Sequence, residues 1–412
     1  MLFRSVAGAE LWVSDGSGAG TRLTADIGPV LASPGPQAIH PFAGGVLFAH
    51  AAAPVSDNEL WRSDGTEAGT VRVRDINPGD AGSNPRSFVT MAGVAYFAAT
   101  TAAEGRELWR SDGTQAGTTL VADLLPGAGS GNPTELFVLG STLYFSATDG
   151  VNGVELWKSD GTTAGTVLVR DIQPGSGGSV PQGMAAMNGF LYFTARTTTT
   201  GFELWRSDGT AAGTAMVRDI QPGTNNGDPY ELLAIGNVLY FAASEDDIGY
   251  GLWRSDGTQA GTVKVLEIDT GTGNTLWEFR VKDGVLLFFN SPVTTGTQLW
   301  RSDGTAGGTV LVRDFPGDEP WYPLDPVVLG GELWFQGRDD AHGYELWRSD
   351  GTPSGTVLAT DAIRPGPCSA YPYEPVEIGG RLYFGAYGAS TGYELWTLTG
   401  DRIFANGFET TP

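Results

Sequence analysis

An eight-residue motif recurs along the whole chain at a nearly constant spacing. It has the form Glu-Leu-Trp-Arg-Ser-Asp-Gly-Thr, and Ala-Gly-Thr follows two residues later. A fixed period of this length predicts an array of one supersecondary unit rather than several unrelated domains. We therefore expect a single repeat domain over residues 1–400 and a tail over residues 401–412 that holds a candidate last strand. The motif tryptophans lie 47 to 49 residues apart, at Trp12, Trp61, Trp109, Trp157, Trp205, Trp253, Trp300, Trp347 and Trp396.

Each repeat contains four short runs typical of β-strands. In one repeat they cover residues 135–140, 142–147, 154–159 and 166–172. The runs are rich in β-branched and aromatic residues and are bounded by Gly, Asn, Asp or Pro, which are strand signals. No segment has the 3.6-residue apolar period of a helix, so helical repeats are excluded.

The turns between the first and second runs predict antiparallel pairing. Asn188-Gly189 and Gly330-Gly331 occupy this place, and such residues tolerate the positive φ of two-residue hairpins. Four antiparallel strands in about 48 residues match the size of a propeller blade. The sequence thus predicts an all-β fold, a β-propeller of four-stranded antiparallel blades. A parallel β-helix ranks below it because that fold lacks tight hairpins.

The number of blades is eight or nine. The second and third strands occur nine times, whereas the first strand and the clear copies of the fourth occur eight times. The segment 402–406 is a candidate ninth copy of the fourth strand. Nine blades with imperfect ends is the preferred count. Eight blades, with N-terminal strands sharing a blade with C-terminal ones, is the alternative.

Composition and charge exclude several classes of function. The formal net charge of −23 disfavours nucleic acid and anionic membrane surfaces as partners. The sequence contains no run of 18 apolar residues, so no transmembrane helix is predicted. Cys368 is the single cysteine, so no intramolecular disulfide can form. Residues 1–5 align with the second strand of other repeats. We therefore expect the chain to begin inside a repeat, with a signal peptide encoded further upstream.

These motifs resemble the ELWxxDGT repeat family of bacterial tandem arrays. The pattern is complete from Glu59, Glu107, Glu155, Glu203 and Glu345, while Gly251 and Gln298 replace the leading Glu and the last copy lacks Asp-Gly. The resemblance implies an exported, propeller-like scaffold without an assigned enzymatic activity. The segment 403–409 is also similar to a C-terminal motif of exported proteins in some Gram-negative bacteria. Both imply an extracellular or cell-surface location in such a bacterium.

The residues that repeat in every unit are expected to be structural. The tryptophans should pack between blades. The Arg or Lys after each Trp, and the acidic residue that ends each fourth strand, should form ion pairs or backbone bonds at blade edges. The Asp-Gly-Thr loops are interpreted as stabilised turns. Calcium binding is the weaker alternative, because the alternating Asp pattern of dedicated calcium loops is missing. No other cofactor or metal is expected.

Residues that break the repeat are the better candidates for a binding site. Aromatic residues appear near the first strand only in later repeats, and carboxylates lie close to some of them. Such pairs suit the recognition of a glycan or a protein ligand. The alternative is that the rings fill the channel or pack on proline. The candidate patch consists of Tyr230, Trp277, Asp318, Glu319, Trp321, Tyr322, Tyr371 and Tyr373.

No catalytic residues are evident. The three histidines, His40, His50 and His342, share no repeat position, and no hydrolase or zinc-protease motif is present. The expected function is a non-catalytic exported scaffold for binding or adhesion. The alternatives are a propeller hydrolase or lyase that acts on polysaccharide, and a purely structural spacer.

Overall fold

The structure is a computed structural model of the 412-residue chain. It describes residues 2–5, 8–15, 20–27, 35–51, 56–246, 249–268, 275–291, 296–315, 323, 325–361, 363–388, 392–399 and 402–405. Within these ranges every regular element is a β-strand. No helix among them is long and apolar enough to cross a membrane.

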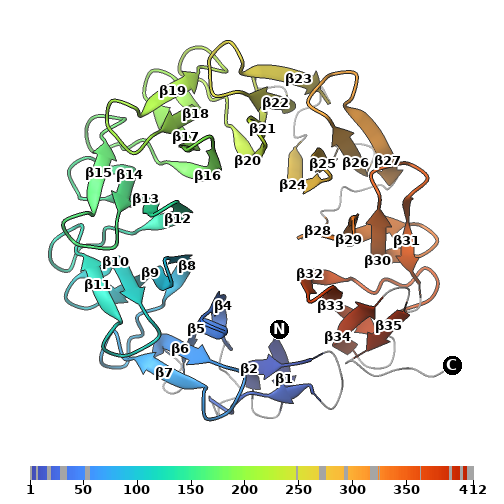
Figure 1. Cartoon of the computed structure of the whole chain (residues 1–412), viewed down its shortest axis with the longest axis horizontal. Coiled ribbons are helices and arrows are strands. Elements are labelled where there is room, and N and C mark those ends of the chain that lie inside the picture. The colour runs from blue at the N-terminus through green and yellow to red at the C-terminus, as the bar shows by residue number, and fades with distance from the viewer. Residues whose placement is uncertain are drawn as a thin grey trace. The chain divides into compact units, whose positions relative to one another are not determined.

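The strands form nine consecutive antiparallel sheets (Figure 1), eight of which have four strands. The first sheet has three, β1 (Leu2–Ser5), β2 (Gly8–Val13) and β3 (Arg22–Leu23). The four-stranded sheets are blades 1 to 8 of a β-propeller, which confirms the predicted fold class. Blades 1 to 4 comprise β4 (Gln37–Phe42), β5 (Gly45–Ala51), β6 (Asn58–Ser63) and β7 (Val71–Arg74); β8 (Arg86–Met91), β9 (Val94–Thr101), β10 (Gly105–Ser111) and β11 (Thr119–Ala122); β12 (Thr134–Leu139), β13 (Thr142–Thr148), β14 (Val154–Ser159) and β15 (Val167–Arg170); and β16 (Gln182–Met187), β17 (Phe190–Thr197), β18 (Gly201–Ser207) and β19 (Ala215–Arg218).

Blades 5 to 8 repeat the same order. They comprise β20 (Tyr230–Ile235), β21 (Val238–Ala243), β22 (Gly251–Ser255) and β23 (Val263–Glu267); β24 (Leu276–Lys282), β25 (Val285–Asn290), β26 (Thr297–Ser302) and β27 (Val310–Phe315); β28 (Val327–Leu329), β29 (Glu332–Asp339), β30 (Gly343–Ser349) and β31 (Thr356–Thr360); and β32 (Tyr373–Ile378), β33 (Arg381–Gly388), β34 (Gly392–Thr399) and β35 (Arg402–Ala405).

The preferred count of nine blades with imperfect ends is wrong, because eight four-stranded blades are present and β1 to β3 form a separate three-stranded sheet. The predicted strand at 402–406 exists as β35, which pairs with β34 and completes blade 8. The sheet of β1 to β3 therefore does not supply a missing strand to blade 8. It lacks a counterpart of the first strand of the other sheets, as the alignment of residues 1–5 with a second strand predicts.

The predicted hairpin turns are confirmed by the backbone. Asn188 and Gly189 have φ of 52° and 78°, and Ala92 and Gly93 have φ of 50° and 79°. Two successive positive values are the signature of a type I′ turn, whose twist matches that of the flanking strands. These turns fix the register of the first and second strands in the blades that contain them.

The chain divides into two compact units, each described here by itself. Unit 1 lies mainly within Gly20–Thr199 and unit 2 mainly within Met216–Pro412, so the division falls inside blade 4. In unit 1 the first strands β4, β8, β12 and β16 contact one another in chain order. In unit 2 the same holds for β20, β24, β28 and β32.

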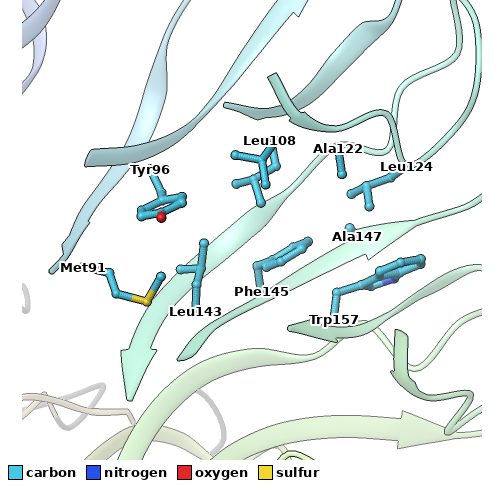
Figure 2. Packing of buried hydrophobic residues seen from close by; sticks show 10 residues of the cluster. Met91, Tyr96, Leu108, Ala122, Leu124, Leu143, Phe145, Ala147 and Trp157 are labelled. Carbon is cyan, nitrogen blue, oxygen red and sulfur yellow. The ribbon is translucent and has the colours of Figure 1, made fainter. Parts of the chain in front are cut away.

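Neighbouring blades are held together by apolar side chains from their facing surfaces. Between blades 2 and 3, Phe145 is fully buried and packs with Leu108, Leu143 and Trp157 (Figure 2). The motif tryptophans Trp109, Trp205, Trp253 and Trp347 are buried in the same way. The prediction that these tryptophans form the core is confirmed.

Candidate functional site

The Asp-Gly-Thr loop is a self-contained turn. Asp112 Oδ1 accepts the N–H of Thr114 at 2.9 Å and its hydroxyl at 2.6 Å. The Thr114 hydroxyl in turn accepts the N–H of Gly117 at 3.0 Å. A Cβ on Gly117 would overlap the Asp112 carboxylate, which explains the second glycine of the motif. The bonds from Thr114 lower the pKa of Asp112. Turn stabilisation, the favoured interpretation of these aspartates, is confirmed.

The cation that follows the motif tryptophan bonds to a loop carbonyl of the next blade at Arg62, Arg110 and Lys158. Arg62 Nη1 donates to the Gly113 carbonyl at 3.3 Å, and Lys158 Nζ donates to that of Gly209 at 2.8 Å. An ion pair is formed by Arg348, whose Nη1 lies 3.0 Å from Glu332 Oε2. The expected ion pairs are therefore replaced in several blades by bonds to carbonyl groups, which tie each blade to the following loop.

The leading glutamate of the motif is buried and holds the connection to the next blade. Glu107 accepts the N–H of Leu124 at 2.9 Å and that of Gly131 at 2.6 Å. Burial raises the pKa of Glu107 and Glu203 to about 7 and that of Glu345 to about 8. These side chains touch scaffold atoms, so we interpret them as structural.

Because the pKa values of these buried glutamates are raised, we expect the protein to lose stability as the pH rises above about 5. Their pKa in the folded state exceeds the value near 4.3 of an unfolded chain. Their stabilising contribution is therefore fully present below about pH 4.3 and is lost as the pH rises through about 7 to 8. Thermal unfolding followed by circular dichroism at constant ionic strength should give a lower Tm at pH 8.5 than at pH 5.5.

Glu345→Gln is the matched variant for this effect. Glu345 Oε1 accepts the N–H of Ala370 at 3.1 Å, whereas Oε2 is buried and has no partner among the described residues. Gln cannot ionise there, so the Tm of the variant should fall less between pH 5.5 and pH 8.5 than the Tm of the parent protein. An equal or larger loss in the variant would contradict the assignment.

One group of carboxylates in blade 1 has the composition of a metal site. One oxygen each from Asp57, Glu59 and Asp75 lies within 4.8 Å of the others. Both oxygens of Glu59, however, accept bonds from Ile76 and Ser83, and Arg72 lies 3.1 Å from Asp57 and 3.3 Å from Asp75. Each carboxylate has at least one donor, although Asp57 Oδ1 and Asp75 Oδ1 are buried without a hydrogen-bond partner among the described residues. We interpret Asp57 and Asp75 as ion-pair partners of Arg72 and Glu59 as structural.

The first strands carry a feature that sequence reasoning missed. Strands β20, β24 and β32 each contain an irregularity in their register, and the residue there has a positive φ; Asp325, which also has a positive φ, lies two residues before β28. In unit 2 this residue is always acidic, with φ of 55° at Glu231, 56° at Glu278, 49° at Asp325 and 48° at Glu374. Residues other than Gly are uncommon in this conformation. We call these four side chains the carboxylate row.

Three members of the row lie on first strands, and Asp325 lies two residues before the first strand β28; these four strands contact one another in chain order. Glu231 Oε2 accepts the N–H of Phe279 in the next blade at 3.2 Å. Burial raises the pKa of Glu278, and the carboxylates of Glu231 and Asp325 raise it further. Arg280 partly offsets this charge, because its Nη2 lies 2.6 Å from Glu278 Oε2. Asp325 and Glu374 are exposed, so the row presents negative charge to solvent.

Three predicted aromatic residues accompany the row, each directly before one of its members. Tyr230 and Tyr373 are the first residues of their strands and Trp277 is the second, so they lie within the strands and not before them. Tyr230 Oη accepts the N–H of Leu276 at 2.9 Å, and Trp277 stacks on Phe289 with centroids 5.6 Å apart. These two rings are half-buried against the scaffold.

The predicted residues Tyr373 and Tyr371 each pack on another tyrosine ring. Tyr373 packs edge-on against Tyr393 at 5.8 Å, and Tyr371 stacks on Tyr344 at 5.2 Å. Asp318, Glu319, Trp321 and Tyr322 lie outside the described residues. An alignment of the repeats by the two-residue turn would have revealed the row, because the acidic residue stands at a constant distance before that turn.

The chain was compared with known proteins in three ways. No family model matches the sequence, and no curated protein matches it. Similar solved structures include a puromycin hydrolase, with 15% identity over 98% of this chain and a TM-score of 0.44. A Mycobacterium tuberculosis puromycin-hydrolyzing peptidase has 9% identity over 80% of this chain and a TM-score of 0.43. One structure from a study of two prolyl endopeptidases has 12% identity over 78% of this chain and a TM-score of 0.47.

This chain spans about half the length of these proteins, 57%, 54% and 49% respectively. All three are named as hydrolases or peptidases. That finding contradicts the expectation of a non-catalytic scaffold for binding or adhesion at the cell surface, which we withdraw. At such identities the likeness concerns the fold alone, and no activity is transferred from it.

Proposed function

We propose that the chain is a propeller module that holds a cationic peptide for processing by a catalytic domain or partner outside the described residues. The observation that carries the proposal is the carboxylate row, with Glu231, Glu278 and Glu374 on the first strands β20, β24 and β32 and Asp325 two residues before the first strand β28. Lys and Arg side chains of a peptide would meet several carboxylates at once. The net charge of −23 would also attract such a peptide from solution.

The aromatic residues next to the row support a peptide over an isolated cation. Tyr230, Trp277 and Tyr373 are half-buried, so part of each ring remains accessible. Aromatic faces attract Lys and Arg cations and provide apolar contact area for the rest of a peptide. We also propose that the chain belongs to the ELWxxDGT repeat family and is exported from a Gram-negative cell, and both proposals are compatible with peptide binding.

A binding experiment tests the row directly. We expect a fluorescein-labelled peptide with four lysines to bind in anisotropy titrations at low salt, and the same peptide with acetylated lysines to bind far more weakly. The triple variant Glu231→Gln, Glu278→Gln and Glu374→Gln should weaken binding about tenfold, since three ion pairs at about 0.5 kcal/mol each amount to about 1.5 kcal/mol. Raising the salt concentration should reduce the difference.

A second triple variant controls for total charge. Asp26→Asn, Glu67→Gln and Asp80→Asn change three exposed carboxylates of unit 1, whereas the row belongs to unit 2. This control should keep the parent affinity within about twofold, because its residues contribute only to the general electrostatic field. Equal losses in the two triple variants, or no loss in either, would overturn the proposed function.

A further inference from the structure

A pocket of about 180 Å³ opens in unit 2 between blade 6 and the Asp-Gly-Thr loop of blade 7. It lies apart from the carboxylate row, and none of its residues belongs to the row. Its wall combines apolar side chains with charges of both signs. The lining residues used below are Lys282, Asp283, Leu287, Arg301, Asp350 and Gly351.

The pocket exists because one residue of the repeat is smaller here. The second strand of most blades carries a tyrosine whose hydroxyl covers the loop glycine of the next blade. A Cβ on Gly161 would overlap Tyr96 Oη, and one on Gly304 would overlap Tyr240 Oη. In blade 6 the same register position, opposite the cation of the third strand, is Leu287. A Cβ on Gly351 would meet only Leu287 Cδ2, at 3.7 Å.

A second departure from the repeat keeps the pocket open. Blade 1 also has a leucine, Leu47, at the tyrosine position. There the space is filled from the first strand by Phe42, whose Cε1 lies 3.3 Å from a Cβ built on Gly113. The residue of blade 6 that corresponds to Phe42 is Lys282, since both directly precede the hairpin turn. Blade 6 therefore lacks both of the aromatic residues that close this space elsewhere.

Among the described residues, some charged groups of the pocket have an ion-pair partner, whereas the Arg301 guanidinium does not. Lys282 Nζ lies 2.6 Å from Oδ2 of the exposed Asp283, and the pKa of Asp350 is lowered by its bonds from Thr352 and also by the Lys282 charge. The Arg301 guanidinium has no hydrogen-bond partner within the described ranges, unlike Arg62 and Arg110 in earlier blades. A fork of N–H donors thus faces the pocket, and a carboxylate is the anion that fits it best.

A carboxylate of the protein lines the same pocket. Asp350 Oδ1 accepts the N–H and the hydroxyl of Thr352 at 2.8 and 2.7 Å. Its Oδ2 accepts no hydrogen bond from the described residues and is free to receive a ligand ammonium group. Leu287 and Val285 provide apolar surface beside both charges.

We infer that this pocket binds a small zwitterion of the α-amino acid class. The ligand carboxylate would lie on Arg301, its ammonium on Asp350, and its side chain against Leu287 and Val285. The volume agrees with this size, because a cavity of about 150 Å³ accommodates benzene, and a free amino acid has about six to nine non-hydrogen atoms. This site is independent of the proposed peptide function.

Ligand-detected NMR with free L-amino acids is the first test. We expect L-leucine or L-valine to bind with a Kd on the order of 1 mM or below, consistent with the affinity limits of so small a ligand. The analogues 4-methylpentanoate and isoamylamine, which lack the ammonium and the carboxylate of leucine, should each bind at least about tenfold more weakly. Equal binding of the analogues, or no binding of any amino acid, would overturn the inference.

The other blades provide variants that close the pocket without unfolding the protein. Leu287→Tyr introduces the residue of blades 2 to 5, and Lys282→Met introduces the residue that blades 2 and 4 have before the turn. Leu287→Tyr should abolish leucine binding while the Tm stays equal or rises. Arg301→Lys should weaken binding about tenfold, whereas Arg110→Lys in blade 2 should leave it unchanged. Retained binding in Leu287→Tyr would exclude this pocket.

Discussion

Replacing Glu59 with alanine is expected to lower the free energy of unfolding by about 4 kcal/mol. The carboxylate accepts the N–H groups of Ile76, Asn77 and Ser83 at 2.8, 3.2 and 2.8 Å and the Ser83 hydroxyl at 2.6 Å. The variant leaves four donors without their partner in a fully buried place. Each orphaned donor costs about 1 to 3 kcal/mol, and relief of the buried charge offsets part of the total.

Urea denaturation provides the measurement, with the midpoint and slope compared at pH 6. Glu67→Ala, an exposed glutamate in the same blade's Asp-Gly-Thr loop, is the control and should stay within about 0.5 kcal/mol of the parent. Glu59→Gln should lie between the two, because its amide retains one acceptor. A loss below about 1 kcal/mol in Glu59→Ala would show that the glutamate does not hold the connection between blades 1 and 2.

The second large effect is expected from Phe145→Ala, which should cost about 3 to 5 kcal/mol. Phe145 is fully buried and packs with residues of both blade 2 and blade 3, among them Leu108 and Trp157 (Figure 2). Removing the ring leaves a cavity that β-strands held by hairpin turns on both sides cannot collapse. The loss should therefore lie near the upper end of that range.

Two further variants make this prediction specific. Phe145→Leu retains most of the buried area and should cost about 1 to 2 kcal/mol. Val151→Ala removes a side chain that is 72% exposed in the same blade and should change the urea midpoint very little. If Phe145→Ala resembled Val151→Ala, packing between the blades would not be a main source of stability.

The expectations that depended on local sequence were largely confirmed. The hairpin at Asn188-Gly189 and the turn around Asp112 rest on interactions within a few residues, so their chemistry is visible in the sequence. The fold class follows from the same local signals repeated at a constant period. The blade count was less accessible. It depended on which strands pair with the N-terminal segment; β1 to β3 form a sheet of their own, and pairing is a contact between strands and not a property of any one strand.

The candidate sites were predicted less well. Tyr230, Trp277 and Tyr373 were identified because they break the repeat, but the acidic residues that directly follow them were overlooked. The sequence shows that Glu231 and Glu278 are 47 residues apart, and only the contact between β20 and β24 shows that they are neighbours. The pocket beside Leu287 escaped notice for a similar reason, since a leucine in a strand looks like an ordinary core residue.

The sequence by itself therefore determined the repeat of this protein: four short strands, tight turns, a core tryptophan and an acidic composition. Each of these follows from backbone preferences and apolar patterning within about 48 residues. The tertiary structure decided how neighbouring repeats contact one another. Glu59 bonds to residues up to 24 positions away, and Leu287 leaves Gly351 uncovered because packing between blades brings the two together. Such contacts depend on the stacking of whole sheets, which no local pattern encodes.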